Sequence, residues 1–303
     1  MSYSDSSISL TPSHAYFIGI DSDGCVFDTM EIKHKECFCP EFIKHFGLQQ
    51  VSRFARETWE FVNLYSRSRG CNRFHALLKV NALMAHRREV LARKAVLPDL
   101  SPLASWVEKE SRLGNPALEG VVRRDGDPLL SRVLNWSVAV NRSIAEMVKE
   151  VAPFPGVVEV LEKAAPLADL MVVSQTPLEA LRREWKENGI DHYPVLIAGQ
   201  ENGTKGEHLQ YAAVGKYAPD RILMIGDAPG DLKAALSNKA LFFPVMPGQE
   251  EASWENFLTE GLDRFFRGSF RGEYQETLIR DFLNRLPETP SWDGLMNEYE
   301  NSL

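Results

Sequence analysis

Residues 15–24 read AYFIGIDSDG, and this stretch decides the fold of the chain. Residues 15–20 form a short apolar run of the kind that a strand buried on both faces produces. The run ends abruptly at Asp21-Ser22-Asp23-Gly24. Two carboxylates directly after a buried strand make the carboxyl end of that strand a candidate functional site.

Beyond residue 152 the chain alternates between apolar runs and segments with helical periodicity. Strands are expected at 169–173, 194–198, 221–225 and 241–245, and helices at 157–165, 178–188, 205–215 and 231–238. Strands separated by helices of about ten residues indicate right-handed crossovers and therefore a parallel sheet. The pattern predicts an α/β fold in which the strand at 15–20 joins the strands beyond residue 152.

One helix start can be predicted residue by residue. Thr176 fits the N-cap of the helix at 178–188, and Pro177 fits its first helical position. Gly189 fits the position just after the helix ends. The strand at 169–173 should therefore lead directly into a loop and a helix N-terminus.

Residues 31–151 show helical spacing throughout. Six apolar residues are expected on one face of a single helix: Leu130, Val133, Leu134, Val138, Ile144 and Val148. The predicted organisation is a discontinuous core (14–31 and 152–247), an inserted helical cap (32–151), a helical C-terminal extension (248–303) and a flexible N-terminal tail (1–13). The cap leaves the core just after Asp23, so it should cover a ligand bound at the strand ends.

Composition and charge exclude several classes of protein. The 303 residues are 44% hydrophobic and 25% charged, which is ordinary for a soluble globular chain. The formal net charge of −8 disfavours nucleic acid and anionic membranes as partners. Four cysteines are too few for a disulfide framework in a chain of this length, and the Ser-rich start lacks the features of a signal peptide. We expect a cytoplasmic protein, either a monomer or a homodimer.

Reactive side chains follow several of the expected strands. The motif at Asp21–Gly24 follows the first strand, Ser174 and Gln175 follow the strand at 169–173, and Lys205 opens a helix. Asp227 and Asp231 follow the strand at 221–225. All of these segments should meet at one edge of the sheet. Carboxylates gathered in one cleft repel one another unless a hard cation neutralises them, so Mg²⁺ is the expected cofactor.

In this order and spacing the motifs resemble those of the haloacid dehalogenase-like hydrolase superfamily, in its helical-cap phosphatase and beta-phosphoglucomutase-like subgroup. The motif Asp-x-Asp-Gly is present as Asp21-Ser22-Asp23-Gly24, and residues 154–157 (FPGV) resemble the re-entry into the core. The resemblance covers roughly residues 14–31 and 152–247. It implies a doubly wound, Rossmann-like sheet, a helical cap inserted after the first motif, and phosphoryl transfer through a phospho-aspartate.

Each motif residue has a chemical role in such a reaction. Asp21 would be the nucleophile, since a carboxylate beside Mg²⁺ needs no deprotonation at neutral pH. Asp23 would be the general acid and base, and its backbone carbonyl a metal ligand. Ser174 and Lys205 would bind and neutralise the phosphoryl oxygens. Asp227 and Asp231 would complete the metal site.

Further residues are candidates for phosphate or substrate binding. Gly24 permits a tight turn that brings amide N–H groups toward the phosphoryl oxygens, and Gln175 lies beside Ser174. Arg67 and Arg69 form part of a basic cluster in the cap that could bind a phosphorylated substrate, although exposed surface charge is the simpler interpretation.

The acidic residue at position 23 decides between reaction types. A leaving alkoxide needs a proton and a leaving halide does not, so Asp23 favours Mg²⁺-dependent hydrolysis of a small phosphomonoester. A phosphomutase shares every core residue and differs in whether the cap shields the phospho-aspartate from water. A non-catalytic binding protein on the same scaffold is the third alternative.

Overall fold

The computed structural model describes residues 8–292 and divides the chain into two units. The core unit contains the chain up to Met30 together with Glu150–Leu286, and the cap unit contains Glu31–Lys149 together with the segment that begins at Pro287. Within the described residues the chain therefore passes between the units after Met30, after Lys149 and after Leu286. No helix in residues 8–292 has the length and apolar character to cross a membrane.

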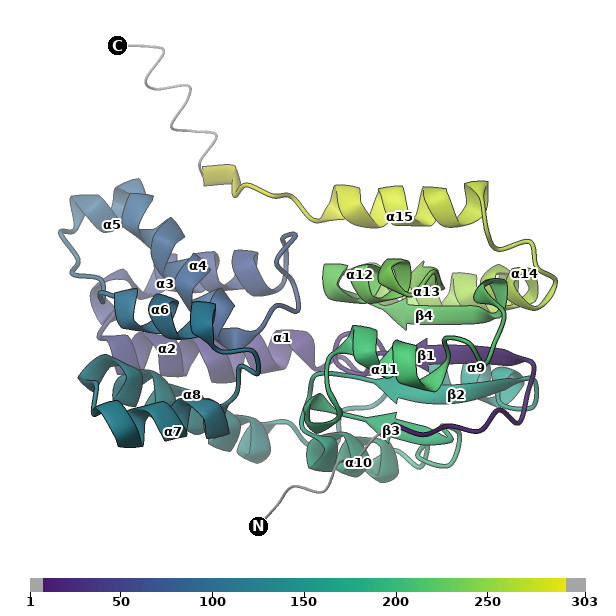
Figure 1. Cartoon of the computed structure of the whole chain (residues 1–303). Coiled ribbons are helices and arrows are strands. Elements are labelled where there is room, and N and C mark those ends of the chain that lie inside the picture. Colours follow the sequence, from purple (N-terminus) through teal and green to yellow (C-terminus); the bar gives the residue numbers. More distant parts are fainter. Residues whose placement is uncertain (1–7, 293–303) are drawn as a thin grey trace. The chain divides into compact units, whose positions relative to one another are not determined.

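A five-stranded parallel sheet forms the centre of the core unit, with the strand order β3-β2-β1-β4-β5. Figure 1 labels β1, β2, β3 and β4 of this sheet. The strands are β1 (Tyr16–Ile20), β2 (Ala168–Val173), β3 (Leu196–Ala198), β4 (Ile222–Gly226) and β5 (Leu241–Pro244). In the central strand, Ile18 is in register with Leu170 of β2 and with Leu223 of β4. The predicted α/β fold with a doubly wound parallel sheet is confirmed.

The strand order places a topological switch point between β1 and β4. The chain proceeds outward from β1 to β2 and β3, and then returns to the other side of β1 with β4 and β5. At such a point the loops beyond the two neighbouring strands diverge and leave a crevice at their carboxyl ends. Asp21 follows β1 and Asp227 follows β4, so both residues lie at this switch point.

Helices cover both faces of the sheet because alternate residues of each strand point to opposite sides. Ile18 packs in a cluster with residues of α9, α10, α13 and α14, whereas Phe17 packs in a cluster with residues of α11, α12 and α15. The helices of the core unit are α9 (Val157–Ala164), α10 (Leu178–Glu187), α11 (Lys205–Ala212), α12 (Pro229–Ser237), α13 (Glu250–Asn256), α14 (Leu262–Phe266) and α15 (Glu273–Arg285). A π-helical segment, Phe257–Gly261, joins α13 to α14.

The cap unit is helical and has its own aromatic core. Its helices are α2 (Cys39–Phe46), α3 (Ser52–Asn63), α4 (Arg73–His86), α5 (Arg88–Ala92), α6 (Ser101–Lys109), α7 (Asn115–Asp125) and α8 (Pro128–Met147). The short α1 (Met30–Ile32) and a π-helical segment, Lys33–Phe38, precede them. The rings of Trp59 and Trp136 meet edge to face at 5.9 Å, and Phe42 lies 5.2 Å from Trp59. All three rings are fully buried.

The described part of the expected N-terminal tail packs on the core unit. Ile8 and Leu10 are buried in the cluster that contains Phe17. Asp169 is 1% exposed and accepts hydrogen bonds from the backbone N–H groups of Ser13 and His14 at 2.9 and 3.0 Å. Residues 8–14 are therefore an ordered part of the fold, and residues 1–7 lie outside the described part of the chain.

The C-terminal extension divides between the two units. α15 packs on the sheet, where the ring of Phe282 lies 5.8 Å from that of Phe242 in β5. The following segment belongs to the cap unit, in which Trp292 lies edge to face with Phe61 at 5.5 Å and under the Arg87 guanidinium at 4.3 Å. The part of the chain predicted as a helical extension contains α13, α14 and α15 up to residue 285, and residues 293–303 lie outside the described residues.

Two local predictions are wrong. Thr176 does not cap α10: the helix starts at Leu178, Pro177 is its N-cap residue, and the N–H of Leu178 donates instead to the Glu201 carboxylate at 2.9 Å. The predicted apolar face of the helix at 128–147 is also partly wrong, because Val138 is 53% exposed and Trp136 is buried. Gly189 does follow the end of α10, with a φ of 67°.

Candidate active site

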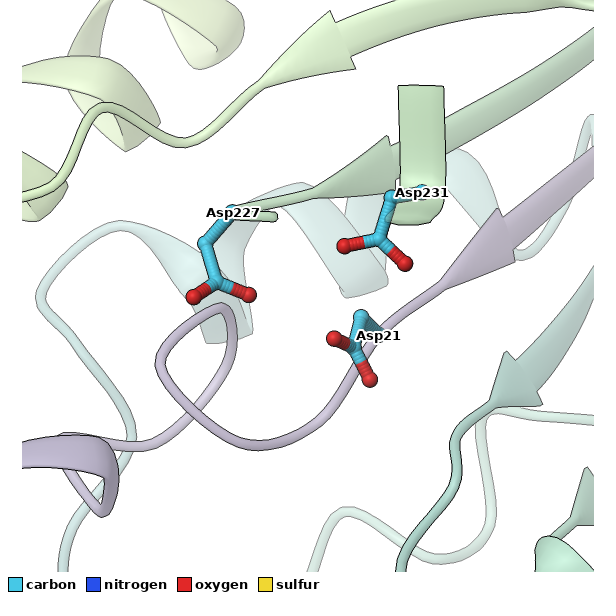
Figure 2. Close-up of side chains that lie close together, drawn as sticks. All are labelled: Asp21, Asp227 and Asp231. Carbon is cyan, nitrogen blue, oxygen red and sulfur yellow. The ribbon is translucent and has the colours of Figure 1, made fainter. Parts of the chain in front are cut away.

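Three carboxylates meet at the carboxyl end of the sheet. Asp21 follows β1, Asp227 follows β4, and Asp231 lies in the first turn of α12. One oxygen atom from each residue lies within 4.8 Å of the other two, and all three residues are buried. Figure 2 shows the three side chains pointing toward one another. The structure therefore brings together three of the predicted site residues.

Lys205 neutralises part of this charge. It is the first residue of α11, as predicted, and Thr204 caps that helix with a hydrogen bond from the Glu207 N–H at 3.3 Å. Its Nζ lies 2.6 Å from Asp21 Oδ2 and 2.5 Å from Asp231 Oδ1. One ammonium group thus joins two carboxylates that come from different βα units.

Burial and the close ion pairs shift the pKa values of the site residues. Burial raises the pKa of Asp21 to about 6, against the opposing attraction of Lys205. Burial likewise raises the pKa of Asp231 to about 6. Burial acts to lower the pKa of Lys205, but attraction to Asp21 and Asp231 outweighs it and raises that pKa. Burial is thus the main cause of the raised pKa values of Asp21 and Asp231, and the attraction of Lys205 offsets only part of it.

The donor set fits a hard divalent cation. Carboxylate oxygens are the ligands that Mg²⁺ and similar ions prefer, and three of them lie close enough to share one ion. An added positive charge would also offset the cost of burying the acids. Asp21, Asp227 and Asp231 would hold the ion.

The Asp23 side chain lies outside this cluster and is held by two hydroxyl groups. Thr29 Oγ1 donates to Asp23 Oδ1 at 2.6 Å, and Thr176 Oγ1 donates to Asp23 Oδ2, also at 2.6 Å. Asp23 is partly exposed, in contrast to Asp21. Its side chain is therefore placed apart from the candidate metal ligands.

Ser174 and Gln175 follow β2, as predicted, but their side chains differ in placement. Ser174 is 2% exposed, and its Oγ accepts a hydrogen bond from the Thr176 N–H at 3.2 Å. Gln175 is exposed, and its Nε2 donates to the backbone carbonyl of Gly203 at 2.8 Å. The structure places Gln175 as a link between two loops and gives no separate support to its predicted phosphate contact.

Two tryptophan side chains hold the loop that follows Asp21. Trp185 Nε1 donates to Ser22 Oγ at 3.1 Å, and Trp254 Nε1 donates to the Cys25 carbonyl at 2.7 Å. Both indoles are fully buried. Gly24 has the positive φ of 71° that the tight turn requires, but its N–H donates to the Phe27 carbonyl rather than into the cleft.

The two predicted arginines lie in the cap unit. Arg69 is 4% exposed, and its Nη1 donates to the Leu64 carbonyl at 3.0 Å. The backbone N–H of Arg67 donates to the Pro287 carbonyl at 3.2 Å, and its guanidinium lies 3.9 Å from Glu288. These contacts lie within the cap unit, and the predicted substrate role of both arginines stays a prediction.

The two threonines and two tryptophans around the motif were not anticipated as site residues. Thr29 lies six residues after Asp23, and apart from this proximity the sequence gives no sign that its side chain contacts the site. The sequence places Thr176 in the segment that follows the strand at 169–173 and predicts it as a helix cap, without a role on Asp23. Trp185 and Trp254 are typical core residues in sequence, and their contacts with the motif loop depend on the tertiary structure.

Buried carboxylates and a lysine lie at the switch point of a Rossmann-like sheet, which is where α/β proteins commonly bind their ligands. The sequence model of the family described as haloacid dehalogenase-like hydrolase matches residues 97–243. The matched region includes Ser174, Lys205, Asp227 and Asp231. Over residues 97–243 this match agrees with the resemblance that the motifs indicate.

Solved structures resemble the chain at low sequence identity. A haloacid dehalogenase-like family protein from Streptococcus pneumoniae is 15% identical, covers 82% of this chain and 98% of its own, and has a TM-score of 0.43. A haloacid dehalogenase-like hydrolase from Xanthomonas campestris is 11% identical, covers 88% of this chain and 99% of its own, and has a TM-score of 0.44. A predicted phosphoglycolate phosphatase from Haemophilus somnus is 18% identical, covers 76% of this chain and 84% of its own, and has a TM-score of 0.39. No curated protein matches the chain.

Proposed function

We propose that this protein is a Mg²⁺-dependent phosphatase that hydrolyses a small phosphomonoester through a phospho-aspartate on Asp21. The observation that carries the proposal is the convergence of Asp21, Asp227 and Asp231 within 4.8 Å, with Lys205 bonded to two of them. A site of this composition can bind a phosphoryl group only if its negative charge is compensated, and Mg²⁺ supplies that compensation when bound.

In the first step Asp21 attacks phosphorus. A new bond forms between an Asp21 carboxylate oxygen and phosphorus, and the bond from phosphorus to the ester oxygen breaks. Asp23 donates its proton to the departing oxygen, which leaves as an alcohol. Asp21 then carries the phosphoryl group, and Asp23 is a carboxylate.

In the second step water attacks the same phosphorus atom. Asp23 takes a proton from the water, and the bond between phosphorus and the Asp21 oxygen breaks. Inorganic phosphate leaves, Asp21 returns to its carboxylate form, and Asp23 is again protonated. The two steps together consume one ester and one water and release one alcohol and one phosphate.

The remaining site residues bind and orient the phosphoryl group. Ser174 is buried directly after β2, where its hydroxyl would donate to a phosphoryl oxygen while its oxygen accepts from the Thr176 N–H. The Lys205 ammonium already contacts Asp21 and keeps positive charge beside the attacked phosphorus. The substrate class that suits this site is a phosphomonoester of a small metabolite.

Phosphate release from 4-nitrophenyl phosphate tests the proposal. We expect release in the presence of Mg²⁺, none after chelation, and a loss of about 10³-fold or more in Asp21→Asn, because the nucleophile is removed. Asp28→Asn is the matched control, since Asp28 belongs to the same segment and is exposed. Unchanged release by Asp21→Asn would contradict the proposal, and so would transfer of the phosphoryl group to a sugar hydroxyl in preference to water.

A further inference from the structure

We propose that Thr176 is a positioning residue for the general acid and base, and that it orients the Asp23 carboxyl group for proton transfer to the leaving oxygen. This inference rests on the proposed function. Its first basis is the short hydrogen bond of 2.6 Å from Thr176 Oγ1 to Asp23 Oδ2, which joins two segments of the core unit that are far apart in sequence.

The Asp23 carboxyl group is fixed at both oxygens. Thr29 Oγ1 binds Oδ1 at 2.6 Å, so the two hydroxyls together define the plane of the carboxyl group. A single donor would leave rotation about the terminal side-chain bond, which is otherwise soft for aspartate. Thr29 Oγ1 also lies 3.5 Å from the Phe27 carbonyl oxygen and can donate to that oxygen instead of to Asp23. Thr176 donates from the loop after β2 and therefore supplies the second contact that fixes the orientation of the Asp23 carboxyl group.

The hydroxyl of Thr176 is not used to start the helix that follows it. A threonine before a helix ordinarily accepts a hydrogen bond from one of the first N–H groups. Here the Leu178 N–H donates to the Glu201 carboxylate at 2.9 Å, and α10 has no side-chain cap from its neighbouring residues. Glu201, from a loop distant in sequence, caps the first N–H group of α10, and the Thr176 hydroxyl donates to Asp23 instead.

The same distant loop holds the backbone of Thr176 in place. Gln200 N–H donates to the Thr176 carbonyl at 3.1 Å. Gly199 approaches so closely that a Cβ atom there would lie 2.7 Å from the same carbonyl oxygen. The contacts of Gly199 and Gln200 thus fix the backbone from which Thr176 donates to Asp23, as a positioning residue requires.

Thr176 also connects the acid to the phosphate-binding side of the site. Its N–H donates to Ser174 Oγ at 3.2 Å, so one short segment carries both the proposed phosphoryl ligand and the hydroxyl on Asp23. When Asp23 gives up its proton, negative charge develops on its oxygens as the ester bond breaks. Two hydroxyl donors already aimed at those oxygens stabilise that charge without reorganisation.

A series of substituted phenyl phosphates tests the inference, because these esters share a shape and differ in how much their leaving groups need a proton. We expect Thr176→Val to lower kcat/KM about 10-fold or more for phenyl phosphate and less than about 2-fold for 2,4-dinitrophenyl phosphate, whose leaving group departs without protonation. The dependence of kcat/KM on leaving-group acidity would become steeper. Thr176→Ser retains the hydroxyl and should restore the wild-type dependence.

Control variants separate this inference from the proposed function. Asp23→Asn should steepen the same dependence further, and wild-type protein must release phosphate from the dinitrophenyl ester only with Mg²⁺. An equal loss across the whole series in Thr176→Val, no loss at all, or no rescue by Thr176→Ser would overturn the role of Thr176 while leaving the phosphatase activity intact. Absence of Mg²⁺-dependent release by the wild type would overturn both proposals.

Discussion

Lys205 is the residue on which the charge balance of the site depends. It forms ion pairs with the buried Asp21 and Asp231, and its own side chain is 15% exposed. Removing one partner of a buried ion pair leaves an uncompensated charge, which costs far more than the pair itself contributes. The site should therefore depend on Lys205 most strongly when no cation is bound.

Lys205→Met should destabilise the chelated protein by about 3 kcal/mol because Asp21 and Asp231 lose their counter-charge. Saturating Mg²⁺ should recover a large part of this loss, because the cation binds the folded state. Urea unfolding with chelator and with Mg²⁺ measures both values. Lys233→Met, which changes an exposed lysine of α12, should change neither. An equal loss of stability under the two conditions would contradict this account.

The predicted site residues that the structure brings together are those whose place in the chain is set locally. Asp21, Asp227, Asp231 and Lys205 follow strands or begin helices, and strand ends gather at one edge whatever the details of packing. The prediction for Thr176 failed because the competing partner of the helix N-terminus, Glu201, lies in another βα unit. Local pattern cannot reveal a partner that only the tertiary structure brings near.

At the scale of elements, the close packing of β4 against α12 fixes the position of Asp231. Gly226 ends β4, and a Cβ atom at this position would lie 2.4 Å from Asp231 Cγ. The carboxylate also accepts the Ala228 N–H at 3.1 Å, which holds it in the first turn of the helix. The absence of a side chain at position 226 thus allows the strand and the helix to present Asp227 and Asp231 together.

Gly226→Ala should displace Asp231 and weaken Mg²⁺ binding about 10-fold or more, as expected when the support of a metal ligand is disturbed. The Mg²⁺ concentration that gives half-maximal phosphate release measures this, with circular dichroism to verify folding. Gly230→Ala in the first turn of α12 is the control, since no atom within 4 Å would obstruct its Cβ. A half-saturating concentration unchanged in Gly226→Ala would refute the steric explanation.

The sequence predicts the alternating βα units to within a few residues because the strands are predominantly apolar runs and the crossovers have helical periodicity. β2 was expected at 169–173 and spans Ala168–Val173, and α11 begins at the predicted Lys205. The cap was predicted only as helical. Its inward-facing residues were partly misassigned, as Val138 shows, because helices packed on several sides carry more than one apolar face.

At the scale of the whole molecule, the N-terminal segment is tied to the core unit through one buried carboxylate. Besides Ser13 and His14, Asp169 accepts a hydrogen bond from Tyr217 Oη at 2.6 Å. Burial acts to raise the pKa of Asp169, but the hydrogen bonds from Tyr217, His14 and Ser13 outweigh it and hold the pKa below its ordinary value of 3.8. The folded state therefore favours the charged form.

The sign of the pH dependence follows from that shift. A carboxyl group with a depressed pKa stabilises the fold above its ordinary value, and this contribution is lost as the pH falls through the folded value. Asp169→Asn should lower the free energy of unfolding by about 2 kcal/mol at neutral pH. The difference from wild type should shrink below about pH 4. Urea titrations across that range test this, with the exposed Asp191→Asn as control; a difference independent of pH would contradict it.

The central position of β1 has a consequence for how the protein is made. During synthesis Tyr16–Ile20 leaves the ribosome long before β2 and β4, the two strands that flank it. Glu31–Lys149 is translated in the interval and can condense first, since domains fold as units while the chain grows. The apolar strand β1 must therefore wait without a neighbour until β2 has emerged, and without its second neighbour until residue 226 has emerged. The nascent chain is most exposed to aggregation in that interval.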